Sequence, residues 1–116
     1  MNQKNISIAE AYYTAMGEKN IAGMEKYLHP AIEFFSPYGQ TSGKEAVLAS
    51  VKGMFSIFTT LTIRAKFGSD DQAMLACDYE FAAPIGIVPT AILITLKDDL
   101  IIRIQLYFDA RHFEKR

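Results

Sequence analysis

The chain has 116 residues, half of them hydrophobic and 22% charged, with a formal net charge of -1 and one cysteine. This length fits a single domain over residues 1–116, and near-equal numbers of basic and acidic residues exclude a broad nucleic-acid footprint. The lone Cys77 excludes a disulfide-built secreted module. Without a leader pattern or an apolar run of about 18 residues, we expect a cytoplasmic protein that does not span a membrane.

Helical patterns occupy the first half of the chain. The spacing of apolar residues predicts one helix over residues 7–16, with Tyr12 on its apolar face, and a second over residues 21–28. Pro30 ends the second helix, because the residue before a proline disfavours the α region. His29, at that helix end, is interpreted as a cap that favours the negative C-terminus of the helix.

A short strand at residues 32–36 and a third helix follow. Ser42 is a candidate N-cap, and Glu45 three residues later completes a capping-box pattern. The apolar face of this third helix comprises Val47, Val51, Met54, Phe55 and Phe58.

The sequence after Thr59 predicts a β-sheet. Alternation of apolar and polar residues predicts strands over 60–67, 74–81 and 100–109, and the continuously apolar run over 90–96 is typical of a central strand. Three helices, one early strand and a four-stranded antiparallel meander make an α+β domain whose sheet closes one face over the helices.

The charged residues of these strands leave two interpretations open. Asp78 and Glu80 are two residues apart, so both side chains point to the same face of their strand. Arg64 and Lys66 on the neighbouring strand have the same two-residue spacing, and Arg103 begins the same spacing on a later strand. This pattern favours cross-strand ion pairs on the outer face of the sheet. A register slip of one residue would instead turn both carboxylates toward the helices.

The order of elements, together with the segments "LHP", "FSPYG", "GKEA" and "YFD", resembles the nuclear-transport-factor-2-like superfamily in its SnoaL-like branch. The resemblance covers nearly the whole chain. It implies a cone-shaped, curved antiparallel sheet wrapped around three N-terminal helices, with an apolar pocket at the open end. It also implies a homodimer formed through the outer face of the sheet.

Within that superfamily, the chain is distantly similar to ketosteroid isomerase, which uses a carboxylate base and an oxyanion-binding pair of Tyr and protonated Asp. The first-helix Tyr of that enzyme corresponds here to Tyr12, or to Tyr13 if the helix slips by one residue. Ser36 occupies the position of the base and Ile92 that of the protonated Asp. A serine cannot take a carbon-bound proton unaided, so unaltered steroid-isomerase chemistry is not expected.

A second resemblance concerns Asp109 in "YFD". In SnoaL-like cyclases, a carboxylate on the late strands acts as a general acid and base, and Asp109 resembles it. The alternative is that Asp109 pairs with Arg111 or Arg103 and only ends its strand. A raised pKa of Asp109 would favour catalysis, because desolvation tunes such acids.

These patterns and the resemblance together predict a pocket for a small hydrophobic molecule, with no cofactor and no metal, since no His/Asp/Glu cluster supplies three ligands. One hypothesis is a cofactor-free isomerase, cyclase or hydratase with Asp109 as acid and base and Tyr12 as hydrogen-bond donor. The alternatives are a non-catalytic ligand-binding module and a protein-interaction domain. The expected ligand contacts are Met16, Phe34, Ser36, Tyr38, Phe55, Ile104, Leu106 and Phe108.

Overall fold

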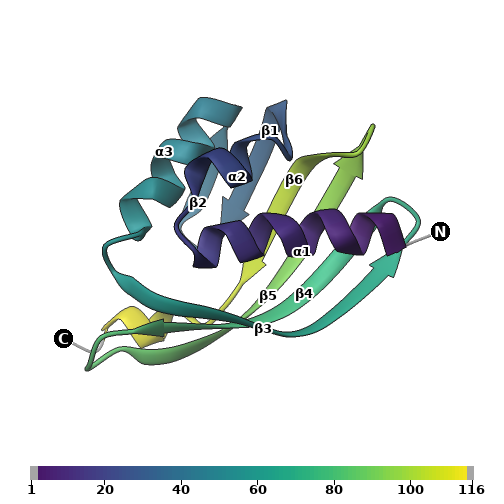
Figure 1. The fold of residues 1–116 in the computed structure, drawn as a ribbon. Coiled ribbons are helices and arrows are strands. Elements are labelled where there is room, and N and C mark those ends of the chain that lie inside the picture. The colour runs from purple at the N-terminus through teal and green to yellow at the C-terminus, as the bar shows by residue number, and fades with distance from the viewer. Residues whose placement is uncertain (1–2, 115–116) are drawn as a thin grey trace.

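The computed structural model describes residues 3–114 and shows helices packed on one face of a curved sheet (Figure 1). In chain order the elements are α1 (Gln3–Gly17), α2 (Ile21–Glu25), β1 (Leu28–Ser36), β2 (Gly39–Ser42), α3 (Lys44–Met54), β3 (Phe58–Ser69), β4 (Gln72–Phe81), β5 (Gly86–Lys97), β6 (Leu100–Tyr107) and the 3-10 helix η1 (Ala110–Glu114). Within these residues, no helix combines the length and hydropathy needed to cross a bilayer.

The six strands form one sheet in the order β2-β1-β6-β5-β4-β3. Neighbouring strands are antiparallel except β1 and β6, which run parallel. The predicted α+β class and antiparallel meander are therefore confirmed, and the early strand β1 adds one parallel pairing, with β6. The parallel pairing arises because β1 enters beside the last strand, and strands so far apart in sequence pair without the hairpin that imposes an antiparallel direction.

The core lies between the helices and the inner face of the sheet. Helix α1 crosses the concave face over β3 and β4, and α3 packs against β1 and β2 (Figure 1). Tyr12 and Met24 from the helices and Leu75, Ile92 and Ile104 from the strands are fully buried in this core. The C-terminal η1 lies at the opposite end of the sheet from the N-terminus (Figure 1).

The second helix is shorter than its pattern predicts. Helix α2 ends at Glu25, and the backbone from Leu28 is already strand β1, so Pro30 lies within a strand rather than after a helix. The β1–β6 pairing shifts register between Leu28 and Glu33, and Pro30 lies within this irregular stretch. A proline is tolerated there because it has no backbone N–H to donate to a regular ladder. The interpretation of His29 as a helix cap is wrong, because its Nδ1 accepts a hydrogen bond from the backbone N–H of Ala31 at 2.9 Å.

The third helix begins differently from its predicted capping box. Ser42 is the last residue of β2, and the N-cap position belongs to Gly43, which makes no side-chain cap hydrogen bond. Gly43 has a φ of 94°, in the left-handed region that favours glycine. Strand β3 starts at Phe58, so this residue belongs to the sheet and not to the apolar face of α3.

The alternation along β4 is confirmed. Cys77 and Tyr79 are buried on the inner face, while Asp78 pairs with Arg64 at 3.5 Å and Glu80 accepts a hydrogen bond from the Thr60 hydroxyl at 3.2 Å. The outer-face interpretation of both carboxylates therefore holds.

Strand β3 departs from strict alternation. A register shift between Ile63 and Ala65 displaces the following residues by one position. Phe67 consequently lies 63% exposed beside Met74, although the pattern places it with the inward residues. Lys66 turns to the helix side and pairs with Glu10 of α1 at 2.9 Å, instead of with an outer-face carboxylate.

We predict that Ile104→Ala lowers the free energy of unfolding by about 2–5 kcal/mol, because it leaves a cavity at a fully buried position in β6. Urea denaturation measures the change. The matched control is Ile57→Ala, at a side chain that is 53% exposed, which should cost much less. Equal losses for the two variants would contradict the assignment of Ile104 to the core.

Candidate functional site

A cavity of about 460 Å³ lies between α1, α3 and the inner face of the sheet, at the end of the sheet that carries η1. Its volume is within the range of small-molecule sites, which is about 300–1,000 Å³. The residues that line it are Tyr13, Met16, Phe34, Ser36, Tyr38, Gly39, Gln40, Thr41, Ser50, Val51, Met54, Ile57, Tyr79, Phe81, Val88, Thr90, Leu106, Phe108 and Phe113.

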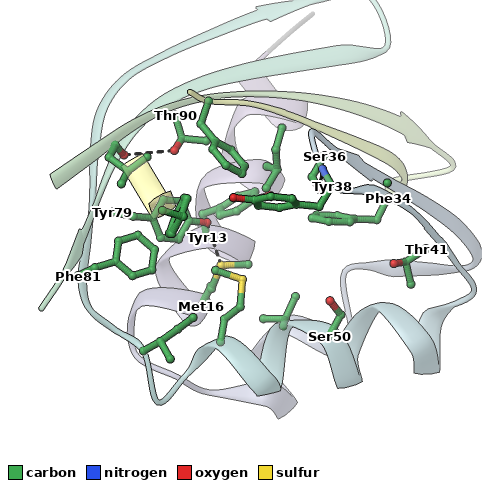
Figure 2. A pocket seen from close by; sticks show the side chains of 18 of the residues that line it. Tyr13, Met16, Phe34, Ser36, Tyr38, Thr41, Ser50, Tyr79, Phe81 and Thr90 are labelled. Carbon is green, nitrogen blue, oxygen red and sulfur yellow. Dashed lines mark hydrogen bonds between the residues drawn. The ribbon is translucent and has the colours of Figure 1, made fainter. Parts of the chain in front are cut away.

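The lining is apolar with a few hydroxyl and amide groups. Tyr79, Phe81 and Thr90 of the sheet lie on one side, and Thr41 and Ser50 lie on the other (Figure 2). Among the lining residues, all within the described part of the chain, there is no Asp, Glu, His, Lys or Arg. The wall therefore offers neutral hydrogen-bonding groups and no formal charge.

Tyr13 brings a hydroxyl into this apolar region. The side chain is 1% exposed, and its hydroxyl has no hydrogen-bond partner in the structure. The ring packs edge to face on Tyr12, with centroids 4.9 Å apart. A buried polar group without a partner costs free energy, so the Tyr13 hydroxyl is an unused donor and acceptor beside the cavity.

Tyr79 faces the same space from β4. Its hydroxyl donates a hydrogen bond to the Met16 sulfur at 3.2 Å, a weak acceptor (Figure 2). Burial raises the pKa of both Tyr79 and Tyr13 well above the usual value of a phenol. Both phenols therefore stay protonated at neutral pH and act as donors rather than as bases.

Two other hydroxyl groups of the wall, those of Thr90 and Ser36, have partners within the protein. The Thr90 hydroxyl donates to the carbonyl oxygen of Val88 at 3.2 Å (Figure 2). The Ser36 hydroxyl accepts from the backbone N–H of Tyr38 at 3.1 Å and so helps to form the β1–β2 turn. This turn holds Tyr38 at the mouth of the cavity, where the side chain is 67% exposed.

Asp109 lies outside the cavity. Its carboxylate accepts hydrogen bonds from Arg111, the shortest being 2.7 Å from Nη2. This guanidinium, together with the backbone N–H of Arg111, holds the pKa of Asp109 well below its ordinary value. Of the two alternatives for Asp109, the structure shows the ion pair with Arg111, and a carboxylate in that state is a poor proton acceptor.

The structure brings six of the eight expected ligand contacts together and places the other two, and the expected donor Tyr12, elsewhere. The cavity is lined by Met16, Phe34, Ser36, Tyr38, Leu106 and Phe108. Ile104 and Tyr12 lie in the core, and Phe55 packs edge to face on Phe58 at 6.2 Å. Of the two alternatives for the first-helix tyrosine, Tyr13 is the one that lines the cavity.

Sequence reasoning missed several lining residues. Tyr79 and Phe81 could have been found, because the β4 alternation already places them on the inner face and the cavity lies at that end of the strand. Phe113 had no such signal, since it lies in a short charged tail with no periodicity.

The described residues 3–114 contain no group of three His, Cys, Asp or Glu side chains that could hold a metal ion.

A curved sheet that encloses an apolar cavity beside its helices defines the class of small α+β pocket proteins. The SnoaL-like domain family matches residues 9–104, so the chain belongs to that family. Among curated proteins, none matches the sequence.

Solved structures share this nuclear-transport-factor-2-like fold. A Kribbella flavida protein is 25% identical with a TM-score of 0.87, covering 94% of this chain and 89% of its own. TerC, co-crystallised with polyporic acid, is 18% identical with a TM-score of 0.83; the match covers 97% of this chain and 96% of TerC. A candidate ketosteroid isomerase from Kribbella flavida is 11% identical with a TM-score of 0.85; the match covers 93% of this chain and 79% of the isomerase chain. The fold also includes a candidate polyketide cyclase and proteins of unknown function.

We predict that Cys77 does not react with a chromogenic disulfide reagent at pH 8 while the protein is folded. The thiol is buried and burial raises its pKa to about 12, so almost no thiolate forms at that pH. In denaturant, one thiol per chain should react at once. Rapid reaction of the folded protein would contradict the inward position of Cys77.

Proposed function

We propose that this protein binds a small, uncharged, mainly apolar molecule that carries a hydrogen-bond acceptor, such as a ketone oxygen. The observation that supports this proposal best is the buried Tyr13 hydroxyl, which has no partner in the protein and belongs to a side chain of the cavity wall. A ligand oxygen would take the place of the missing partner. The phenol, whose raised pKa keeps it protonated, would donate to it.

The absence of charge in the described cavity wall favours an uncharged ligand. A carboxylate or ammonium group placed among Phe34, Phe81 and Phe108 would lose its hydration without gaining a counter-ion, which is costly. The aromatic side chains instead favour a ring-containing molecule, because rings pack edge to face or offset at low entropic cost. TerC, a structure of the same fold, was co-crystallised with polyporic acid, which agrees with a small organic ligand.

The same wall favours binding over acid–base catalysis. An isomerase or cyclase reaction needs a group that accepts a proton near neutral pH, and the lining residues include no carboxylate, imidazole or amine, while burial raises the pKa of the Tyr13 and Tyr79 phenols. Asp109, the carboxylate in the catalytic hypothesis, is exposed and paired with Arg111. A carrier, sensor or storage role for an apolar molecule needs no such group.

We predict that Tyr13→Phe weakens the preference of the protein for a ketone over the matching hydrocarbon. The probes are 1-tetralone and tetralin, which differ at one carbonyl, and calorimetry measures both affinities. The ratio of the two affinities should fall about tenfold in the variant, as expected for loss of one hydrogen bond. The free energy of unfolding should stay equal or rise, because the substitution removes an unpartnered hydroxyl.

Tyr12→Phe is the matched control for this experiment. The Tyr12 hydroxyl is equally buried and unpartnered, yet Tyr12 does not line the cavity. Its substitution should affect unfolding in the same direction and leave the affinity ratio unchanged. The same ratio in wild type and Tyr13→Phe would count against the proposed donor.

We further propose that a second copy of this chain covers the outer face of the sheet. One cross-strand row there comprises Met74, Leu93, Gln105 and Phe35, all only half-buried in one chain. Leu93 lies at the centre of this row, between β4 and β6. Three apolar side chains left partly in water, on β4, β5 and β1, favour association.

We predict that Leu93→Lys produces a monomer in light scattering coupled to size-exclusion chromatography, where the wild type elutes as a dimer. The added charges would face each other across the interface and lose hydration. Ile57→Lys, at an exposed position on the other side of the molecule, should leave the dimer intact. A monomeric wild type would refute the dimer.

A further inference from the structure

The chain beyond β6 folds back over the mouth of the cavity. Strand β6 ends at Tyr107, and after Phe108 and Asp109 the backbone forms the short 3-10 helix η1, seen at the cavity end of the sheet in Figure 1. A backbone hydrogen bond from the N–H of His112 to the carbonyl of Asp109, at 3.2 Å, joins η1 to the residue that precedes it. Short 3-10 segments are weakly stable by themselves, so side chains must hold this one in place.

Phe113 is the residue through which η1 contacts the cavity. Its ring packs edge to face on Phe81 at 5.0 Å, on Phe108 at 5.6 Å and on Tyr38 at 6.3 Å between centroids. All four rings line the cavity, and they come from four separate segments of the chain. Phe113 thus joins the β1–β2 turn, the end of β4 and the end of β6 across the opening.

The Asp109–Arg111 pair fixes the start of η1. Asp109 Oδ1 accepts from both the backbone N–H and the Nε of Arg111 at 3.0 Å, and Oδ2 accepts from Nη2 at 2.7 Å. One carboxylate therefore caps the first turn of η1 and binds the guanidinium in a bidentate manner. The Asp109 and Arg111 side chains are 44% and 83% exposed, so water competes with the pair and its contribution to the stability of η1 is small.

We propose that residues 108–114 form a lid over the cavity, with Phe113 as the ring that seals it against Tyr38 and Phe81 and Asp109 as the positioning residue that keeps η1 folded through Arg111. This inference rests on the proposed function, because a lid matters only if the cavity takes up a ligand. Entry and release then both require η1 to move away from the Tyr38 and Phe81 rings. Asp109 acts on the kinetics of binding without touching the ligand.

Stopped-flow fluorescence with N-phenyl-1-naphthylamine, an uncharged apolar probe, tests the lid. In Asp109→Asn the association and dissociation rate constants should both rise, by about fivefold, since an exposed pair of this kind contributes little more. The equilibrium affinity should change little. Phe113→Ala should raise both rates further, by about tenfold, because its edge-to-face contacts are lost. A residue that is only part of the wall would raise dissociation alone.

Glu33→Gln is the matched control for Asp109→Asn. It breaks another exposed carboxylate–arginine pair, Arg103–Glu33 at 3.3 Å, which lies on β1 and β6 away from η1. Both rate constants should remain at the wild-type value. Rates that are unchanged in Asp109→Asn and Phe113→Ala would overturn the lid while the cavity still binds the probe. Failure of the wild type and of both lid variants to bind any probe would overturn the lid and the proposed function together.

Discussion

The inner face of the sheet is longer than the helices that cover it, and the cavity follows from this difference. Strands β3 and β5 have 12 residues each, about 40 Å when extended at about 3.3 Å per residue. Helix α1 has 15 residues and measures about 22 Å at about 1.5 Å per residue. Placed across β3 and β4, α1 buries one part of the concave face, and α3 covers β1 and β2 beside it. The ends of β4, β5 and β6 nearest η1 contribute inward-facing, mainly apolar side chains to one wall of the cavity, and α1 and α3 contribute to the opposite wall.

Three buried tyrosine hydroxyls in this region lack good hydrogen-bond partners, which lowers the stability of the fold. Tyr12, Tyr13 and Tyr79 point into the same dry region, and two of their hydroxyls find no partner while the third finds only the Met16 sulfur. A sequence selected for stability alone would place phenylalanine at such positions, because an unpaired buried hydroxyl costs about 1–3 kcal/mol. The two unpaired cases differ in one respect. Tyr12 is enclosed by the core, whereas the Tyr13 side chain belongs to the cavity wall.

The sequence predicted what depends on local pattern and missed what depends on register and on tail packing. Alternation along β4 placed Cys77 and Tyr79 inward because both faces of that strand keep a strict period of two. The same rule failed for Phe67, since a bulge after Ile63 has no signature in a run that alternates on both sides of it. The first-helix tyrosine was ambiguous because Tyr12 and Tyr13 are about 100° apart on the helix and both meet apolar surroundings. Which of them faces a cavity depends on where the sheet extends beyond α1, and this is a tertiary property.

Asp109 illustrates how a strand-end carboxylate can serve either chemistry or structure. A catalytic acid needs a dry environment that raises its pKa, which requires the chain after the strand to leave the carboxylate pointing inward. Here the chain reverses at once into η1, and Arg111, two residues later, supplies a guanidinium within 2.7 Å in solvent. The ion pair lowers the pKa of Asp109 and keeps the carboxylate on the surface. The same reversal carries Phe113 back toward Phe81 and Phe108, so an aromatic ring occupies the rim of the cavity. Local pairing over two residues thus keeps the Asp109 carboxylate out of the cavity, whose described lining carries no charged side chain.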